Sequence, residues 1–324
     1  MKRYDELKLG SEKGMSKIPF CCPCQEKSKL KKIENGFVCE HSECVHSMGD
    51  NCFPIIKNVP VLISEERCDT VCSTGEVKSV VSRPMSKLGF LKKIIVGESA
   101  TTKKNCARFV QELKKMTDRP RVLIIGSGEK GAGTDTLWED KDIERHGVDI
   151  YVSDSVDAVC DAHYLPFESN SYDGIWIQAV LEHVVEPNSV VSEIYRVLNV
   201  NGVVYAETPF MQQVHEGAYD FTRYTVLGHR YLFKKFHAIE FGGNKGPEIV
   251  LAWAFRYFVW SITRSRKLAR ILGLVFGMLM RPFAFFVSSK SMHDASSGVF
   301  FLGFKRIDHD LSHKELVSLY RGQF

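Results

Sequence analysis

The sequence predicts an α/β fold with a mainly parallel sheet, preceded by a small cysteine-rich unit. "RVLII", residues 121–125, is a continuous apolar run, as expected for a strand covered on both faces of a sheet. The loop after it carries Gly126, Gly128 and Gly131 in G-x-G-x-x-G order, so the strand turns tightly into a helix. Six of the ten cysteines lie between positions 21 and 52. A long apolar and basic run before the last predicted strand indicates a helical insertion.

Composition is that of an ordinary globular protein with one large and one smaller domain. The chain has 324 residues, of which 44% are hydrophobic and 25% are charged. Its net charge of +4 is too mild to indicate nucleic acid as a partner. The first residues are charged and lack an apolar core, so we expect no signal peptide and a cytoplasmic location. No charge-free apolar run reaches about 18 residues, so a simple transmembrane helix is not expected.

The cysteine-rich unit contains two cysteine pairs with the spacing of a metal site. Cys21 and Cys24 form one pair, Cys39 and Cys44 form the other, and an Asn-Gly turn lies between them. Two thiolate pairs from two turns can close a tetrahedron around zinc, whereas free or redox-active thiols are the alternative. Alternatives to this ligand set stay open: Cys22 could replace Cys21, and Cys52, His41 or His46 could replace one of the second pair.

The paired cysteines are followed by "FPIIKNVPVLISEE", residues 53–66. Together they resemble the small zinc-ribbon family that occurs as an activator subunit of methyltransferases and is fused to bacterial ones. The resemblance implies a zinc-ribbon-like domain over residues 17–66 with a structural zinc ion. A linker over residues 67–105 is expected to follow.

A second strand, "VDIYVSD" at residues 148–154, ends in an acid. A carboxylate at this place can accept two ribose hydroxyls, both in nicotinamide-dependent dehydrogenases and in proteins that bind other adenosine cofactors. The next segments separate the two classes. They contain five short motifs in order: Asp161-Ala162, Leu165-Pro166-Phe167, Tyr172-Asp173, Leu181-Glu182-His183, and Arg196-Val197-Leu198 with Gly202.

These motifs resemble the methyltransferase-domain family of class I S-adenosylmethionine-dependent methyltransferases. The resemblance covers roughly residues 120–245 and a last strand near 298–306. It implies a Rossmann-like seven-stranded sheet in a domain over residues 106–310, with a C-terminal tail at 311–324. S-adenosyl-L-methionine is the implied cofactor. One departure is Ile124, which stands where the family often has an acid.

The resemblance also assigns cofactor-binding roles to residues of this chain. Gly126, Ser127 and Gly128 would wrap the methionine part of the cofactor, and Asp154 would hold the ribose. Two further pairs are assigned: Asp161 and Ala162 to the adenine, and Gln178 and Leu181 to the sulfonium and substrate side.

The candidate catalytic segment is "ETPFMQQVHEGAYDFTRYT", residues 207–225, after the fifth strand. His215 titrates near neutrality and is the expected base, with Asp220 to orient it. Arg223 is expected to bind an anionic group of the substrate, although a structural Asp220–Arg223 ion pair is the alternative. "DFTRYT" resembles a segment of methyltransferases associated with bacterial glycan gene sets.

The expected reaction is therefore O-methylation of a sugar or lipid-linked surface-glycan precursor. The alternatives are methylation of a quinone-like small molecule and a catalytically degenerate interaction module. RNA is a third possible acceptor, suggested by the zinc ribbon, but the sequence shows no matching aromatic and basic surface for it.

The insertion is expected to form two helices at residues 248–263 and 266–288. Between Ile249 and His293 there are seven Lys or Arg residues and no acid. Such a stretch can lie in a membrane interface, with its cations on anionic lipid. We expect peripheral membrane contact through residues 248–290, with a helical lid or a dimer interface as the alternative. The sequence does not indicate the oligomeric state.

Overall fold

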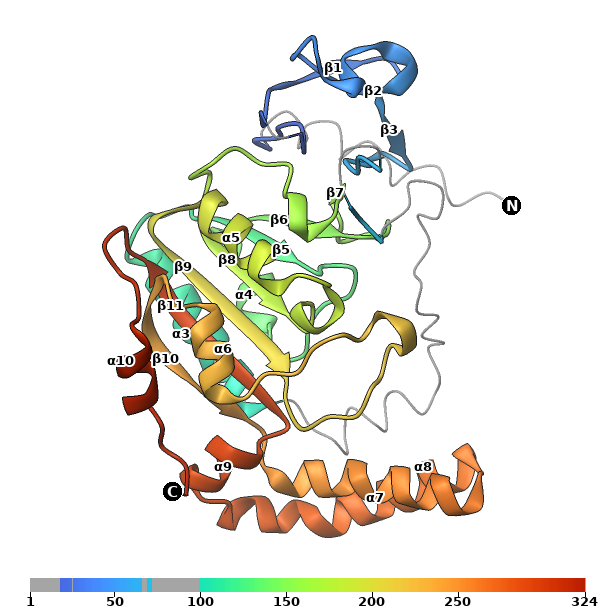
Figure 1. Cartoon of the computed structure of the whole chain (residues 1–324), viewed down its shortest axis with the longest axis vertical. Helices are drawn as coiled ribbons and strands as arrows, with labels where there is room; N and C mark the ends of the chain where they lie inside the picture. Colours follow the sequence, from blue (N-terminus) through green and yellow to red (C-terminus); the bar gives the residue numbers. More distant parts are fainter. Residues whose placement is uncertain (1–17, 25, 66–68, 72–98, 324) are drawn as a thin grey trace.

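The structure, a computed structural model, describes residues 18–24, 26–65, 69–71 and 99–323 (Figure 1). Most of the predicted linker at 67–105 lies outside these residues.

A seven-stranded sheet forms the centre of the molecule, with the strand order β10-β11-β9-β8-β5-β6-β7. Strands β7, β6, β5, β8 and β9 run parallel, and β11 pairs antiparallel with both β9 and β10. The strands are β5 (Arg121–Ile125), β6 (Glu144–Asp149), β7 (Ala158–Val159), β8 (Tyr172–Gln178), β9 (Leu198–Pro209), β10 (Phe236–Asn244) and β11 (Gly298–Lys305). The predicted α/β fold with a mainly parallel seven-stranded sheet is confirmed.

Helices cover both faces of this sheet (Figure 1). On one face, Phe109 and Leu113 of the helix before β5 pack against Trp176 and Tyr205. On the other face, Ile194 belongs to a core cluster that holds the opposite side chains of the same strands. The helices are α3 (Ala100–Lys114), α4 (Asp135–Glu139), α5 (Pro187–Val197), α6 (Val226–Leu232), α9 (Ser289–Ala295) and α10 (His313–Ser318).

Two helices lie partly or wholly outside the expected domain boundaries. Helix α3 begins at Ala100, six residues before the expected start of the domain at 106, and Ser99 caps it by accepting from the Thr102 N–H at 3.1 Å. The predicted tail at 311–324 contains α10, which a Ser312–Glu315 capping box starts.

The predicted strand at 148–154 is wrong. Strand β6 ends at Asp149, and Ile150 after it is 40% exposed. The N–H groups of Gly126 and Ser127 occupy the Val148 carbonyl at 2.9 and 3.0 Å, so the next residues leave the sheet as a loop. The sequence pattern misled because apolar residues continue past the point where the strand has a partner.

The cysteine-rich unit, which we call the head, is a four-stranded sheet in the order β1-β2-β3-β4. Its strands are β1 (Leu30–Ile33), β2 (Gly36–Cys39), β3 (Phe53–Ile56) and β4 (Val59–Pro60). The turn at Glu34 and Asn35 joins β1 to β2, as the Asn-Gly signal predicts.

The head packs against the β7 edge of the large sheet (Figure 1). Val61 forms a parallel bridge with Val159, and the Leu62 N–H donates to the Val159 carbonyl at 2.8 Å. Phe20 stacks on Phe167 with ring centres 5.6 Å apart. These contacts cover the exposed edge of the sheet, so the head and the domain share one hydrophobic core.

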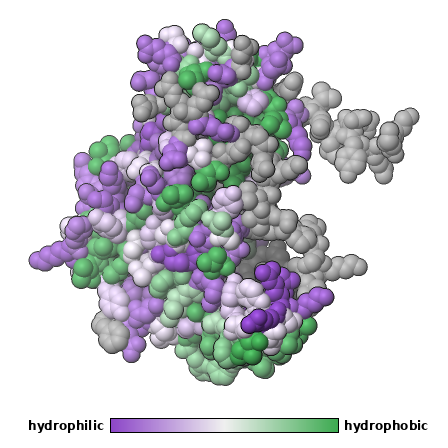
Figure 2. Space-filling view, turned by 45° about the vertical axis from the view of Figure 1, so that its right-hand side comes forward, coloured by the Kyte–Doolittle hydropathy of each residue, from purple (hydrophilic) through white to green (hydrophobic). Residues whose placement is uncertain are grey.

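The insertion is a helical hairpin of α7 (Pro247–Thr263) and α8 (Arg266–Met280), followed by the 3-10 helix η6 (Arg281–Phe286). It projects from the end of the domain opposite the head (Figure 1), and hydrophobic side chains gather on that end of the surface (Figure 2). The two predicted helices are confirmed, except that the α-helical part of the second ends at Met280. Gly273 lets the helices approach closely, because a Cβ there would lie 2.8 Å from Arg256 Cβ.

By length and composition one described segment, Arg266–Phe286, could cross a membrane. Its mean hydropathy is 1.6, and 11% of its most apolar window is buried. Arg270 and Arg281 interrupt the apolar run of this segment, so the expectation that the chain has no simple transmembrane helix stays a prediction.

We predict that Phe167→Ala lowers the free energy of unfolding by roughly 3–5 kcal/mol, the usual cost of emptying a buried phenylalanine site. Phe167 is 0% exposed and joins the head to the domain. Chemical denaturation measures the change. Phe285→Ala is the matched control, because Phe285 is 90% exposed, and an equal loss in the two variants would contradict the prediction.

Candidate active site

The glycine-rich loop lies where β5, β6 and β8 end. Gly126 has a φ of 80°, and a Cβ there would lie 2.3 Å from Val180 Cγ2. Both conditions require glycine at this position. The Gly128 N–H donates to Asp149 Oδ2 at 2.7 Å.

The acid beside this loop is therefore Asp149, the last residue of β6. Asp154, the predicted strand-end acid, is exposed in the turn that follows. Sequence reasoning missed Asp149 because it extended the strand by five residues; the acid in "GVD" at the end of the true strand was the available signal.

The other predicted cofactor residues lie along the same edge. A Cβ at Gly131 would lie 2.3 Å from Gln178 Oε1, so Gln178 touches the glycine-rich loop. Leu181 is fully buried in the core. Asp161 is 6% exposed and accepts from the His163 N–H at 2.9 Å and from His163 Nδ1 at 2.6 Å. Burial acts to raise the pKa of Asp161, but these hydrogen bonds outweigh it and lower the pKa below its usual value.

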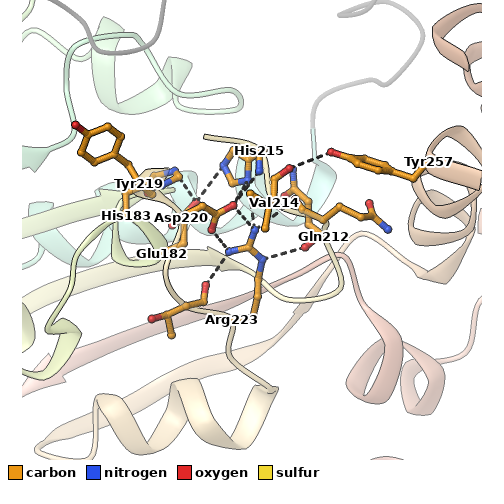
Figure 3. Close-up of polar contacts among 11 residues, drawn as sticks. Glu182, His183, Gln212, Val214, His215, Tyr219, Asp220, Arg223 and Tyr257 are labelled. Carbon is orange, nitrogen blue, oxygen red and sulfur yellow. Dashed lines mark hydrogen bonds and ion pairs between the residues drawn. The ribbon is translucent and has the colours of Figure 1, made fainter. Parts of the chain in front are cut away.

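A second group of polar side chains comes from the loops after β8 and β9 (Figure 3). Glu182 and His183 lie in a 3-10 turn after β8, and the Glu182 carbonyl accepts from the Phe221 N–H at 2.8 Å. His183 Nδ1 lies 2.6 Å from the Tyr219 carbonyl, so this nitrogen donates. These bonds bring the segment that carries His215 against the end of β8.

Asp220 organises that segment. Its carboxylate accepts from the His215 backbone N–H at 2.9 Å, and its Oδ2 lies 3.2 Å from His215 Nδ1. Arg223 binds both of its oxygens. Burial acts to raise the pKa of Asp220, but hydrogen bonds from Arg223 and from the His215 backbone outweigh it and lower the pKa to about 2.

The expectation that Arg223 binds an anion is corrected here. Besides Asp220, the guanidinium donates to the carbonyls of Gln212 at 3.0 Å and Thr222 at 2.8 Å (Figure 3). The N–H donors of the Arg223 guanidinium are thus already hydrogen-bonded within its own loop. Asp220 and Arg223 therefore form the structural ion pair that was the alternative.

Glu182 is the residue of this group that sequence reasoning missed. It is 0% exposed, and neither carboxylate oxygen has a hydrogen-bond partner among the described residues. Burial raises the pKa of Glu182 to about 8. Its Oε1 lies 3.7 Å from His183 Nε2 and 3.9 Å from His215 Nε2. The arrangement suits proton transfer, and these three side chains could also hold a divalent cation.

A third group lies in the head, where Cys22, Cys24, Cys39 and Cys44 place their sulfurs within 4.8 Å of one another. Cys22 takes the place predicted for Cys21. Cys21 pairs with Lys29 in a bridge, and alternate residues of an extended chain share a side, which groups Cys22 with Cys24. All described cysteines have free thiols.

Comparison with known proteins agrees with this fold. Residues 125–206 match the methyltransferase domain family. No curated protein matches the chain. Phosphoethanolamine N-methyltransferase 2 of Haemonchus contortus, in complex with S-adenosyl-L-methionine, is a similar solved structure with 20% identity, a TM-score of 0.43, and coverage of 67% of this chain and 56% of that chain.

Two further similar structures come from archaea. The S-adenosylmethionine-dependent methyltransferase of Archaeoglobus fulgidus has 17% identity and a TM-score of 0.42, covering 68% of this chain and 100% of its own. A complex of the Trm112 methyltransferase activator with a protein described as a methyltransferase, from Haloferax volcanii, has 18% identity and a TM-score of 0.38, covering 64% and 95%.

The family match and the seven-stranded sheet that contains the matched residues show that the central domain resembles a methyltransferase domain.

Proposed function

We propose that the protein transfers a methyl group to a hydroxyl of a sugar or lipid-linked surface-glycan precursor at the membrane surface. The observation that carries the proposal is the position of His215. It lies between the buried Glu182 and the ionised Asp220, beside the end of β8 and next to the arginine-rich hairpin. Methyl transfer needs an aligned nucleophile, and a hydroxyl acceptor also gains from a base.

His215 is the proposed base. Asp220 is nearer to Nδ1 than Arg223 is, at 3.2 Å against 3.5 Å, which favours a proton on Nδ1 and leaves Nε2 to accept one. Burial, aided by the neighbouring His183, lowers the pKa of His215. The imidazole is therefore neutral, and able to take a proton, at pH 7. Asp220 and Arg223 act as positioning residues.

Membrane contact at the cytoplasmic face is part of the proposal. The hairpin exposes Phe258, Ile262, Ile271 and Leu279, each by more than a third of its surface. It carries no acid from Ile249 to His293, so its charge complements anionic lipid.

We propose that the cofactor is S-adenosyl-L-methionine and that Gly126, Ser127 and Gly128 bind its methionine part. Asp149 replaces Asp154 as the partner of the ribose, because it ends β6 and touches the glycine-rich loop. The other roles are carried over from the sequence resemblance as part of the proposal: Asp161 and Ala162 at the adenine, and Gln178 with Leu181 toward the sulfonium.

Asp149→Asn is expected to weaken S-adenosylhomocysteine binding at least tenfold, since an amide loses one of the two acceptors for the ribose hydroxyls. Asp154→Asn, five residues away and exposed, is the matched control and should bind as the wild type does. Calorimetric titration measures both. A larger loss in Asp154→Asn would return the ribose role to that residue.

We also propose that the head is a zinc ribbon held by Cys22, Cys24, Cys39 and Cys44. Four thiolates at ~2.3 Å from a tetrahedral zinc ion lie about 3.8 Å from one another. The Cys22 and Cys44 sulfurs are 3.8 Å apart. The ion would stabilise a unit whose own core is small, and the unit in turn covers the β7 edge.

Cys22→Ser should lose the zinc ion, whereas Cys21→Ser should retain it. The two residues are adjacent and equally buried, which makes them a matched pair. Metal analysis of the purified proteins measures zinc per chain. Retention in Cys22→Ser together with loss in Cys21→Ser would restore the ligand set expected from sequence.

The acceptor is tested with labelled S-adenosylmethionine and a membrane extract. Label in the saccharide released by mild acid supports the proposal, whereas label in a neutral quinone-like lipid contradicts it in favour of the alternative acceptor. S-adenosylhomocysteine binding without transfer to either fraction also contradicts it.

His215→Ala should lower this transfer about 10²–10⁴-fold. In the wild type, the rate rises with pH through the lowered pKa of His215 and then levels off, because the neutral imidazole is the active form. Asp220→Asn removes a charge that raises this pKa, so the rise moves to lower pH. His237→Ala, on an exposed part of β10, is the control. A loss of activity with EDTA and an unshifted profile in Asp220→Asn would assign the role to a cation at Glu182 instead.

A further inference from the structure

A cavity of about 320 Å³ lies between the hairpin and the catalytic segment. Among the described residues, His215 forms part of its wall, and the other lining residues come from α7 and α8. The hairpin residues that line it are Arg256, Tyr257, Trp260, Arg266, Ala269 and Arg270. The wall thus combines three cations and two aromatic rings with the proposed base.

The three arginines have no ion-pair or hydrogen-bond partner among the described residues. The Arg256 guanidinium lies 5.1 Å from the centre of the Tyr257 ring, and that of Arg266 lies 5.0 Å from the Trp260 ring. Rings in these positions hold the guanidinium planes without using their N–H donors. With no acid between Ile249 and His293, three cations around one cavity repel one another, and an anion offsets that repulsion.

A hydrogen bond joins the wall of the cavity to the catalytic segment. The Tyr257 hydroxyl donates to the Val214 carbonyl at 3.0 Å, one residue before His215 (Figure 3). Arg256 precedes Tyr257 and packs against Gly273 of α8. A group bound by the arginines is therefore at a fixed distance from His215.

We propose that this cavity binds a phosphate or diphosphate group of the methyl acceptor. Arginine forks match phosphate oxygens in paired hydrogen bonds, and three of them suit a group with more than one negative charge. The volume falls within the range of small-ligand sites. The inference rests on the proposed function: the bound phosphate would leave the sugar hydroxyl at His215, while a lipid chain would follow the apolar surface of the hairpin.

Inorganic pyrophosphate is the probe, titrated into the full-length protein by calorimetry. The double variant Arg256→Gln with Arg270→Gln should lose at least tenfold in affinity. The matched control is Lys267→Gln with Lys290→Gln, which removes the same charge from exposed positions outside the cavity and should bind as the wild type does.

Vesicles of phosphatidylcholine, with and without phosphatidylglycerol, separate the acceptor's phosphate from lipid headgroups. Supporting outcomes are pyrophosphate binding lost only in the arginine variant and similar, partial losses of vesicle binding in both variants. Absent pyrophosphate binding in the wild type, or equal loss of it in both variants, overturns the proposal. S-adenosylhomocysteine binding is measured in parallel, and its absence in the wild type would count against the proposed function and not against this cavity.

Discussion

The parallel pairing of β5 with β6 and β8 is the constraint on which the site depends. Parallel strands end at the same edge of a sheet, so the glycine-rich loop, Asp149 and the Glu182–His183 turn meet there, although about sixty residues separate the first from the last. Strand β9 pairs with β8 and ends at the same edge, so the segment with His215, which follows β9, also lies there. The hydrogen bonds between the strands therefore bring these segments of the candidate site to one edge of the sheet.

The two additions to the domain use its exposed parts in different ways. The head continues the sheet beyond β7 with backbone pairs and a shared apolar core, which removes an open edge. The hairpin is attached beside the segment that carries His215 and leaves much of its apolar surface uncovered (Figure 2). One addition covers an edge of the sheet, whereas the other presents a new surface beside the candidate site.

Charge is divided differently between the candidate site and the hairpin. Arg223 neutralises Asp220 in the loop after β9, and Asp220 in turn holds the backbone and ring of His215. Arg256 and Arg266 of the hairpin have no ion-pair partner within the described part of the chain and lie over aromatic rings instead. Among the described residues Glu182 also has no cation or hydrogen-bond donor paired with it, and its buried carboxyl adjoins both histidines.

The sequence by itself determined the sheet, the resemblance to methyltransferase domains, the hairpin in the head and the two helices of the insertion, because periodicity, glycine turns and short motifs are local properties of the chain. Only the tertiary structure decided that β6 ends at Asp149, that Cys22 replaces Cys21, and that Arg223 is already paired. A strand ends where its backbone loses its hydrogen-bonding partner, and the role of a side chain depends on which distant groups contact it in the folded chain. Neither property can be inferred from the spacing of neighbouring residues.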